Sequence, residues 1–299
     1  MTVPGYDPGA GVVVLGMHRS GTSAVTRVVN LLGADLGPAD DLLTQVDNPA
    51  GHWESKALVA CNDRILGAFG RSWDFPPWLA AGWEHGRRAD ALVPELADTF
   101  RRVFGRGPWV WKDPRTCLTL PLWRRVLGAG ACVVLVGRDP AAVVTSIHRR
   151  DGIPRVYAAG LWQHYVRAAV QGAAGMPVAC VRFEDLVRRP ERTIATLADD
   201  LRALGVDLPG DPGDAAATLR ADLVHGSGAP PVLRRLTART AAVLDALPRV
   251  SPVFDPPAWR EPAWVRPLLV AYRGPWVVRA RTGHPLRPMA GAPGAGTGP

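Results

Sequence analysis

Four short runs of apolar residues mark the first two thirds of the chain. They cover 11–17, 109–111, 131–137 and 177–183, and they are rich in β-branched residues without an alternation of polar and apolar positions. Such runs are typical of strands that are buried on both faces, as in a parallel sheet. We therefore expect four central strands at these positions.

Segments with a helical pattern separate the four runs. Helices are expected over seven segments: 22–33, 54–69, 88–104, 118–128, 140–150, 155–173 and 191–204. This alternation predicts an α/β fold with three layers, a central parallel sheet and right-handed crossovers. Ligands of such sheets bind at the carboxyl ends of the strands, so chemically active residues are expected directly after each run.

The pattern weakens after Pro209 into stretches rich in Pro and Gly. Two further helices are expected near 213–223 and 232–247, and the residues from 286 to 299, rich in Gly, Ala and Pro, are expected to be disordered. We expect a single domain over 1–285, with its core at 11–204 and a helical C-terminal part at 205–285.

Hydrophobic residues make up 47% of the chain, but no stretch approaches the roughly 20 apolar residues of a membrane helix. No basic leader with a hydrophobic segment begins the chain, so a soluble, unsecreted protein is expected. The formal net charge of +8 fits nucleic acid, an acidic membrane surface or a small polyanion. No zinc-knuckle or aromatic RNA-binding signature is present, which disfavours nucleic acid. Arginine pairs carry much of this charge and are expected on solvated faces: Arg87–Arg88, Arg101–Arg102, Arg124–Arg125 and Arg188–Arg189.

The four cysteines show no paired spacing. Cys61, Cys117, Cys132 and Cys180 lie far apart, and the last two fall within expected strands. This distribution is typical of buried, reduced thiols and indicates a cytoplasmic protein.

The first apolar run ends in the small-residue turn Gly16–Met17–His18–Arg19–Ser20–Gly21–Thr22–Ser23. Backbone N–H groups in such a turn, together with the start of the following helix, bind phosphate-like anions. The spacing of Gly16 and Gly21 fits the start of the Walker pattern, but Thr22 occupies the lysine position and Arg19 lies inside the loop. The lysine that binds the β- and γ-phosphates of ATP is therefore missing. The alternative is an ordinary turn between a strand and a helix.

The third run ends in Gly137–Arg138–Asp139–Pro140, where Asp139 is a favourable N-cap and Pro140 suits the first helical turn. In this register Ser146 shares one face of the helix with Arg150, while Val143 and Ile147 point toward the sheet. The alternative is a capped surface helix with ordinary arginines.

Together the two segments resemble the nucleotide-binding motifs of sulfotransferases that use PAPS (3′-phosphoadenosine 5′-phosphosulfate), a family with a P-loop-like fold. The resemblance covers roughly 11–204 and is closest to the bacterial branch with the run GMHRSGT. It implies that the first loop binds the 5′-phosphosulfate, with Arg19 where relatives carry Lys or Arg. The loop residues concerned are His18, Arg19, Ser20, Gly21, Thr22 and Ser23, with orientation of the backbone alone as the alternative role of His18.

In this family a strand-end Arg and a helical Ser eight residues later bind the 3′-phosphate, which implies this role for Arg138 and Ser146. An additional Arg recurs in tyrosylprotein sulfotransferases, matching Arg150, with Arg149 as the alternative. Phe183 stands where relatives carry a Tyr near the adenine, although a strand-end Phe is often simply core. The C-terminal Arg-Lys-Gly motif of animal cytosolic members is not visible here.

The resemblance also implies the catalytic groups. Lys112 begins a Lys-Asp-Pro element like that of tyrosylprotein sulfotransferases, where this lysine contacts the transferred group; Lys56 is the only other lysine of the chain. Asp113 and Arg115 are expected to form a structural ion pair or a turn. Glu54 is the preferred base, His52 the alternative, and Arg19 lies in the loop beside the transferred group.

The implied reaction moves the sulfuryl group of PAPS to a hydroxyl of a small-molecule or carbohydrate acceptor, leaving PAP, and requires no metal. A kinase-like phosphotransferase and a catalytically silent PAP-binding protein are the alternatives. The aromatic segment 71–86 either shapes the acceptor pocket or packs a long loop against the core. The sequence does not indicate the oligomeric state.

Overall fold

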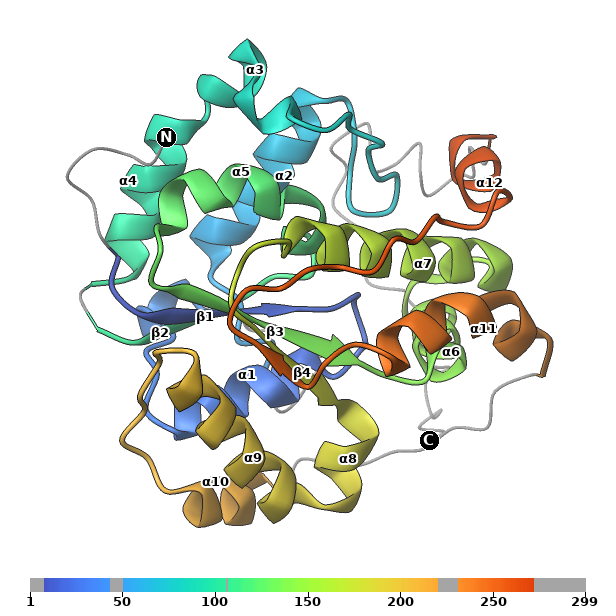
Figure 1. Ribbon diagram of the computed structural model, residues 1–299. Helices are drawn as coiled ribbons and strands as arrows, with labels where there is room; N and C mark the ends of the chain where they lie inside the picture. The colour runs from blue at the N-terminus through green and yellow to red at the C-terminus, as the bar shows by residue number, and fades with distance from the viewer. Residues whose placement is uncertain (1–7, 44–50, 106, 220–230, 272–299) are drawn as a thin grey trace, which may run out of the picture.

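A computed structural model of the chain describes residues 8–43, 51–105, 107–219 and 231–271 (Figure 1). The expected disordered tail at 286–299 lies outside the described residues. Five strands form the described sheet in the order β2 (Trp109–Lys112), β1 (Gly11–Leu15), β3 (Ala131–Gly137), β4 (Val178–Arg182) and β5 (Val250–Ser251). The first four are parallel, as predicted, and the short β5 runs antiparallel to β4.

Strands β1, β2 and β3 are buried along their whole length, which explains their continuous apolar sequence. Successive side chains of β1 enter opposite layers: Val12 and Val14 belong to one core, Val13 and Leu15 to the other. The register pairs Val14 with both Lys112 and Val134. The carboxyl ends of β1, β2 and β3 therefore meet at one edge of the sheet.

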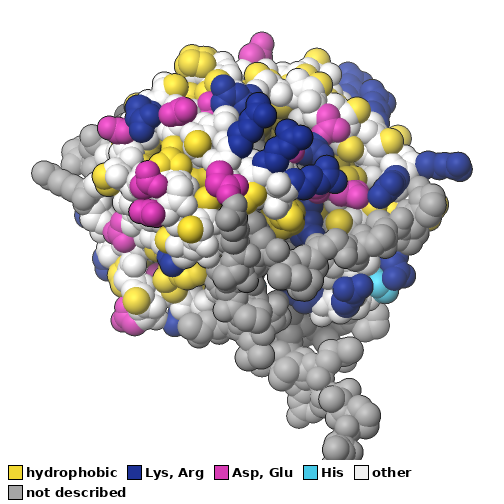
Figure 2. Space-filling view, turned by 90° about the horizontal axis from the view of Figure 1, so that it is seen from below, with side chains coloured by type: hydrophobic (Ala, Val, Ile, Leu, Met, Phe, Trp, Pro, Cys, Tyr) yellow, Lys and Arg dark blue, Asp and Glu magenta, His cyan; other side chains and the backbone are white. Residues whose placement is uncertain are grey.

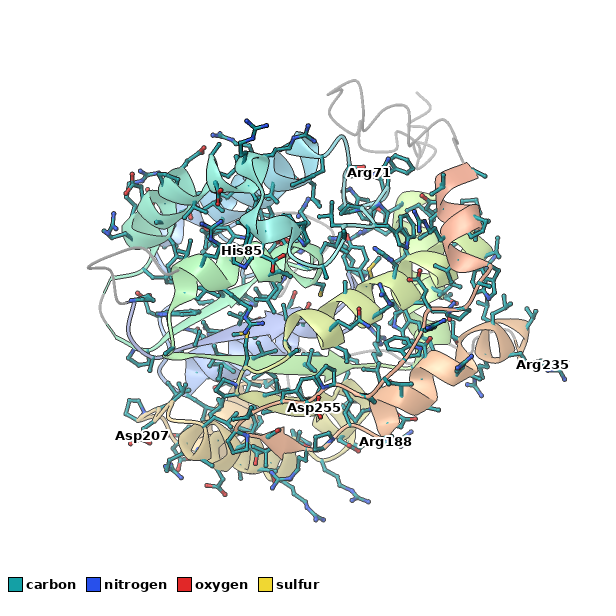
Figure 3. The ribbon with its side chains drawn as sticks, turned by 45° about the horizontal axis from the view of Figure 1, so that its top comes forward. Arg71, His85, Arg188, Asp207, Arg235 and Asp255 are labelled. Carbon is teal, nitrogen blue, oxygen red and sulfur yellow. The ribbon has the colours of Figure 1, made fainter. Side chains whose placement is uncertain are left out.

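Helices cover both faces of the sheet, as the three-layer prediction requires. One layer contains α1 (Thr22–Leu31), α8 (Phe183–Arg188), α9 (Pro190–Ala203) and α10 (Pro212–Leu219), drawn below the sheet in Figure 1. The other contains α2 (Lys56–Ala68), α4 (Val93–Val103), α5 (Thr116–Leu127), α6 (Pro140–Asp151) and α7 (Arg155–Gly172). In Figure 3, Arg71 lies above the sheet, and Asp207 and Arg188 lie below it.

The C-terminal part is helical where it is described. Helix α11 (Pro231–Asp245) and helix α12 (Val265–Ala271) pack near α7. Leu233, Phe254, Trp259 and Leu269 are buried in the same hydrophobic core as α7. This segment therefore completes one of the two layers.

Three features differ from the sequence-based expectations. The helix expected over 88–104 is broken into α3 (Arg87–Asp90) and α4, because Pro94 lacks an N–H group and occupies the first turn of a new helix. Helix α8 begins at Phe183, where the strand was expected to end. Strand β5 and helix α12 were not expected, since short elements of this kind depend on tertiary contacts more than on pattern.

The arginine pairs lie mainly on the surface, as expected: of the eight residues, all are exposed except Arg125, which is half-buried. Figure 2 views the molecule from below, and Lys and Arg side chains gather on the face that it shows, with Asp and Glu among them. Across the described part of the chain, no helix is both long and apolar enough to cross a membrane.

All four cysteines are free thiols, as predicted. Cys180 is half-buried and the other three are buried. Burial raises the pKa of Cys117, Cys132 and Cys180 to about 12, so these thiols stay protonated near neutral pH.

Candidate functional site

The loop between β1 and α1 adopts a backbone that few sequences allow. Arg19 has a φ of 69°, and Gly21, the N-cap of α1, has a φ of 86°. A Cβ on Gly21 would lie 2.1 Å from Cδ2 of Phe183. Glycine is required at 21 both by this conformation and by this close approach. The resulting turn exposes the start of α1, whose first N–H groups have no partner within the helix.

The two segments expected to bind phosphates are in direct contact. Arg19 Nε donates a hydrogen bond to Ser146 Oγ at 2.9 Å, and Arg138 Nη1 donates one to the carbonyl of Arg19 at 2.8 Å. The Arg138 guanidinium lies 4.5 Å from the centre of the Phe183 ring. Burial lowers the pKa of Arg138 from its usual value. The carboxyl ends of β1 and β3 thus place cations from two motifs side by side.

Helix α6 begins as predicted. Asp139 caps it by accepting a hydrogen bond from the N–H of Ala141 at 2.9 Å, and Pro140 occupies its first turn. Val143 and Ile147 are fully buried, as their spacing predicts. Arg150 lines the pocket described below, whereas Arg149 is exposed and is absent from its lining. Arg150 forms an ion pair with Asp151 at 2.9 Å.

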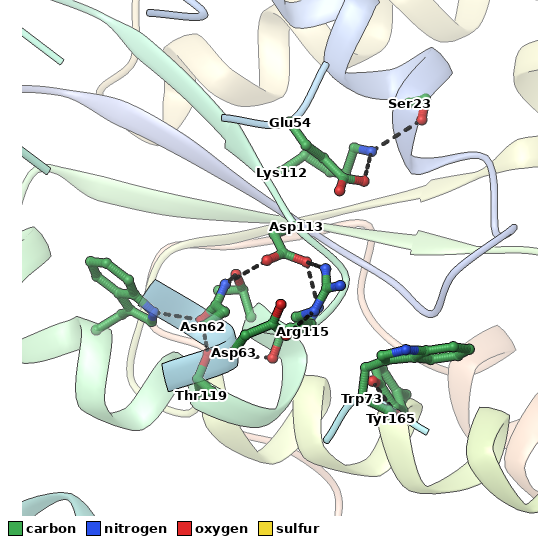
Figure 4. Close-up of polar contacts among 12 residues, drawn as sticks. Ser23, Glu54, Asn62, Asp63, Trp73, Lys112, Asp113, Arg115, Thr119 and Tyr165 are labelled. Atoms are coloured by element: carbon green, nitrogen blue, oxygen red, sulfur yellow. Dashed lines mark hydrogen bonds and ion pairs between the residues drawn. The ribbon is translucent and has the colours of Figure 1, made fainter. Parts of the chain in front are cut away.

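Lys112 and Glu54 form a buried ion pair at the end of β2 (Figure 4). Lys112 Nζ donates to Glu54 Oε1 at 2.5 Å and to Ser23 Oγ at 3.1 Å. Their side chains are only 2% and 9% exposed. Glu54 immediately precedes Ser55, the N-cap of α2, so the helix start holds it in place. Ser23 also donates to the carbonyl of His52 at 3.3 Å. The ammonium group therefore contacts both the expected base and Ser23 at the start of α1.

The turn after Lys112 is rigid. Asp113 accepts hydrogen bonds from the N–H and Nη1 of Arg115 at 2.9 and 3.1 Å, which confirms the predicted ion pair. Asn62 donates to Asp113 at 2.8 Å, and its own oxygen accepts from Trp123 Nε1 at 2.8 Å. Burial raises the pKa of the Asp113 carboxyl. This network fixes the backbone that carries Lys112.

A pocket of about 160 Å³ collects most of the expected site residues. Of the residues expected in the site, it is lined by His18, Arg19, Gly21, Thr22, Ser23, His52, Glu54, Lys112, Arg138, Arg150 and Phe183. Two expected residues do not line it. Ser20 is buried and its N–H donates to the carbonyl of Met17 at 3.0 Å, while Ser146 reaches the site through Arg19.

His18 is a neutral imidazole within a cationic environment. Burial, followed by the charges of Arg150, Arg115 and Lys112, lowers its pKa well below the usual value. Its buried Nε2 has no hydrogen-bond partner in the described structure. Its ring lies 4.9 Å from that of Trp73.

Six residues that line the pocket were not among the expected site residues: Ala24, Arg27, Gly51, Trp53, Pro114 and Leu219. Trp53 adopts a φ of 56°, an uncommon value for a non-glycine residue. The Arg27 guanidinium lies 4.7 Å from the centre of its ring. Arg27 follows Thr22 by more than one helical turn, and no motif marks it. Leu219, at the end of α10, carries no sequence signal at all.

The fold and the pocket define an α/β protein whose pocket, at the carboxyl ends of parallel strands, is lined by Arg and Lys side chains. A profile of the sulfotransferase family matches residues 11–208. The chain belongs to the sulfotransferase family, and it is therefore a transferase.

No curated protein matches the chain. Among solved structures, the chain is similar to the sulfotransferase domain of the olefin synthase from Synechococcus PCC 7002 (17% identity, 91% of this chain and 98% of that one, TM-score 0.44). It is also similar to the sulfotransferase domain of the curacin biosynthetic pathway (15% identity, 79% of this chain and 99% of that one, TM-score 0.42). A third similar structure is sulfotransferase STF1 from Mycobacterium tuberculosis H37Rv (16% identity, 78% of this chain and 77% of that one, TM-score 0.41).

Proposed function

We propose that this protein transfers the sulfuryl group of PAPS to a hydroxyl of a small-molecule or carbohydrate acceptor, giving PAP and a sulfate ester. The observation that carries this proposal is the position of Lys112, whose ammonium contacts both Glu54 and Ser23. One cation thereby lies between a carboxylate that can accept a proton and a loop suited to an anion. Sulfuryl transfer needs both functions within a few ångströms of the reacting atoms.

Donor binding is assigned to the two linked segments. The loop from His18 to Ser23 and the start of α1 would hold the 5′-phosphosulfate. Arg138, Ser146 and Arg150 would hold the 3′-phosphate, because a guanidinium fork and a hydroxyl suit a doubly charged oxyanion. The Phe183 ring, which lies against Gly21 and Arg138, offers a face for the adenine.

The chemical step follows from the Lys112–Glu54 pair. The acceptor oxygen attacks the sulfur, its proton passes to the Glu54 carboxylate, and the bond between sulfur and the bridging oxygen breaks. The electron pair of that bond stays on the 5′-phosphate of PAP, where the Lys112 ammonium and the Arg19 guanidinium stabilise it. Lys112 must move from Glu54 toward the donor for this step, and Ser23 lies on that path. His52, which also lines the pocket, is the alternative base.

The setting of the reaction is also proposed. Within the described structure, no group of three or more His, Cys, Asp or Glu is arranged to hold a metal ion. Four free thiols suit a reducing compartment, and we place the protein in the cytoplasm. Its acceptor is a small molecule or a carbohydrate and not a nucleic acid, and residues 1–285 act as one catalytic domain.

The proposal is tested by incubating the purified protein with sulfur-labelled PAPS and a panel of glycans, phenols, lipids and natural-product aglycones. Labelled product is expected, and it is lost in Lys112→Ala and Glu54→Gln while PAP affinity is largely retained. The matched control is Lys56→Ala, since Lys56 is exposed and its Nζ donates to the carbonyl of Asp40, outside the pocket lining. Magnesium-dependent turnover of ATP would instead indicate a kinase. PAP binding without any transfer would indicate a silent binding protein.

A further inference from the structure

A second depression lies between helix α7, helix α11 and the segment that connects β5 to α12, which Figure 1 shows next to one another. Its volume is about 650 Å³, and it shares no lining residue with the pocket that contains Lys112. Each of the three elements contributes an arginine to the lining: Arg167 of α7, Arg239 of α11 and Arg260 of the connecting segment. We call this depression the basic groove.

The positive charge of the basic groove is not paired with carboxylates. In the described structure no ion pair or hydrogen bond engages Arg167, Arg239 or Arg260, and no Asp or Glu is among the described lining residues. Helix α7 itself contains no Asp or Glu. Glu261, next to Arg260 in the sequence, forms a buried contact of 2.9 Å with a histidine ring of α7. Asp255 is exposed and lies outside the lining. The three guanidinium groups are therefore available to an anionic ligand.

The lining also contains a buried hydrogen-bond donor without a partner. Trp259 is only 7% exposed, and its Nε1 has no hydrogen-bond partner in the described structure. An unpaired buried N–H group costs free energy, and native structures contain few of them. An oxygen atom of a ligand in the basic groove would supply the acceptor that this group lacks.

The uncharged lining residues favour a peptide over a simple anion. Gln171 lies one helical turn after Arg167 on the same face of α7, and its side-chain amide both donates and accepts hydrogen bonds. A peptide group also donates and accepts, whereas a phosphate-like dianion only accepts. Pro256 and Pro257 add ring surface without N–H groups, against which the aliphatic part of a side chain can pack. Guanidinium forks bind the carboxylates of Asp and Glu with two parallel hydrogen bonds.

This chain is a poor source of such a ligand. Residues 262–299 contain no Asp or Glu, so the C-terminal end lacks the necessary charge. A second copy of the chain carries a formal net charge of +8, which opposes association through a basic surface. Charge complementarity therefore favours a different, acidic protein.

We infer that the basic groove binds an acidic segment of a partner protein. Carboxylates of that segment pair with Arg167, Arg239 and Arg260, and one of its oxygen atoms accepts the N–H of Trp259. The inference goes beyond the proposed sulfuryl transfer and does not depend on it, because the two sites have no lining residue in common.

Binding is tested by fluorescence anisotropy with the full chain and a labelled peptide of alternating glutamate and alanine. The matched probe has glutamine in place of glutamate. The acidic peptide is expected to bind at least about tenfold more tightly, and less tightly as the salt concentration rises. Because the donor pocket is also cationic, each titration is repeated with PAP. Equal affinity for the two peptides, or displacement of the acidic peptide by PAP, overturns the inference.

The site is tested with two variants. Arg239→Glu is expected to weaken binding of the acidic peptide about tenfold or more, because it places a carboxylate against carboxylates. Trp259→Phe keeps a ring but removes the N–H and is expected to weaken binding about fivefold. Thermal unfolding checks that both variants are folded, and Arg239 is exposed, so its replacement leaves the core intact. Unchanged affinity in either variant overturns the inference.

The matched control is Arg192→Glu. It makes the same change in net charge at an exposed position of α9, in the other helical layer and outside the lining of the basic groove. Its affinity for the acidic peptide is expected to equal that of the wild type, and an equal loss in Arg192→Glu and Arg239→Glu overturns the inference. Vesicles containing phosphatidylserine and a DNA oligonucleotide represent other anionic partners. Tighter binding of either than of the peptide, lost in Arg239→Glu, also overturns it.

Discussion

Arg19 and Ser146 are 127 positions apart in the chain and are joined by a hydrogen bond of 2.9 Å from Nε to Oγ. This contact links the loop after β1 to helix α6 after β3. Both ends of the proposed donor site are therefore held together before any ligand binds, which reduces the cost of ordering them on binding.

Arg138→Ala is expected to weaken PAP binding by about 2 kcal/mol, or roughly 30-fold, because a charge-assisted contact is lost. The variant also removes the support for the carbonyl of Arg19. Ser146→Ala is expected to be milder, since a neutral hydroxyl contributes less. Calorimetric titration with PAP measures both, with Arg188→Ala, an exposed arginine of α8, as the control. Unchanged PAP affinity in Arg138→Ala rules out its assignment.

The Lys112–Glu54 pair makes a prediction about stability. Lys112→Met leaves a buried carboxylate without its partner and is expected to lower the free energy of unfolding by about 3 kcal/mol. The double variant Lys112→Met/Glu54→Gln is expected to recover much of that loss, because neither buried charge remains. Urea denaturation measures the difference. If the double variant is as unstable as the sum of the two single variants, the side chains are not coupled.

Gly21→Ala is expected to abolish PAP binding and to destabilise the fold. The new Cβ would meet the Phe183 ring, and a φ of 86° is unfavourable for alanine. Gly70→Ala separates the two causes, since Gly70 has a φ of 66° with no atom within 4 Å of a new Cβ. Thermal unfolding and PAP titration of both variants are the measurements. Equal destabilisation in the two variants would show that contact with Phe183 is unimportant.

The lowered pKa of His18 predicts that the stability of the protein depends on pH. Its pKa is lowered in the folded protein, so the unfolded chain binds this proton first as the pH falls below about 6.5. The free energy of unfolding should therefore decrease below that pH, by at most about 1.4 kcal/mol per pH unit from this group. His18→Gln is expected to show a smaller decrease than the wild type between pH 7.5 and 5.5. His85→Gln, at an exposed position, is the control. Identical slopes in wild type and His18→Gln contradict this role for His18.

Much of the fold is encoded locally. The four parallel strands follow from continuous apolar runs such as 131–137, and the start of α6 follows from Asp139 and Pro140. The ends of β1, β2 and β3 come together because parallel strands share an edge, so residues after each run were expected near one another. Strand β5 was missed because two residues carry no pattern, and their pairing depends on the edge of β4.

The candidate site was predictable only in part. Loop and helix-start residues such as Gly21 and Arg138 have sequence signatures, because anion binding constrains their backbone and charge. Arg27, Trp53 and Leu219 do not, since their place in the pocket depends on how separate elements pack. The contact between Lys112 and Glu54 likewise joins residues 58 positions apart, and no local sequence pattern indicates a contact between residues so far apart.

The central claim is that one pocket holds a nucleotide by phosphates at both its 5′ and 3′ ends. Calorimetric titration with PAP and with adenosine 5′-phosphate, which lacks the 3′-phosphate, tests this claim most directly. PAP is expected to bind about 30-fold more tightly, because Arg138 and its neighbours contact the additional phosphate. Equal affinity for the two nucleotides, or no binding of PAP, would contradict it.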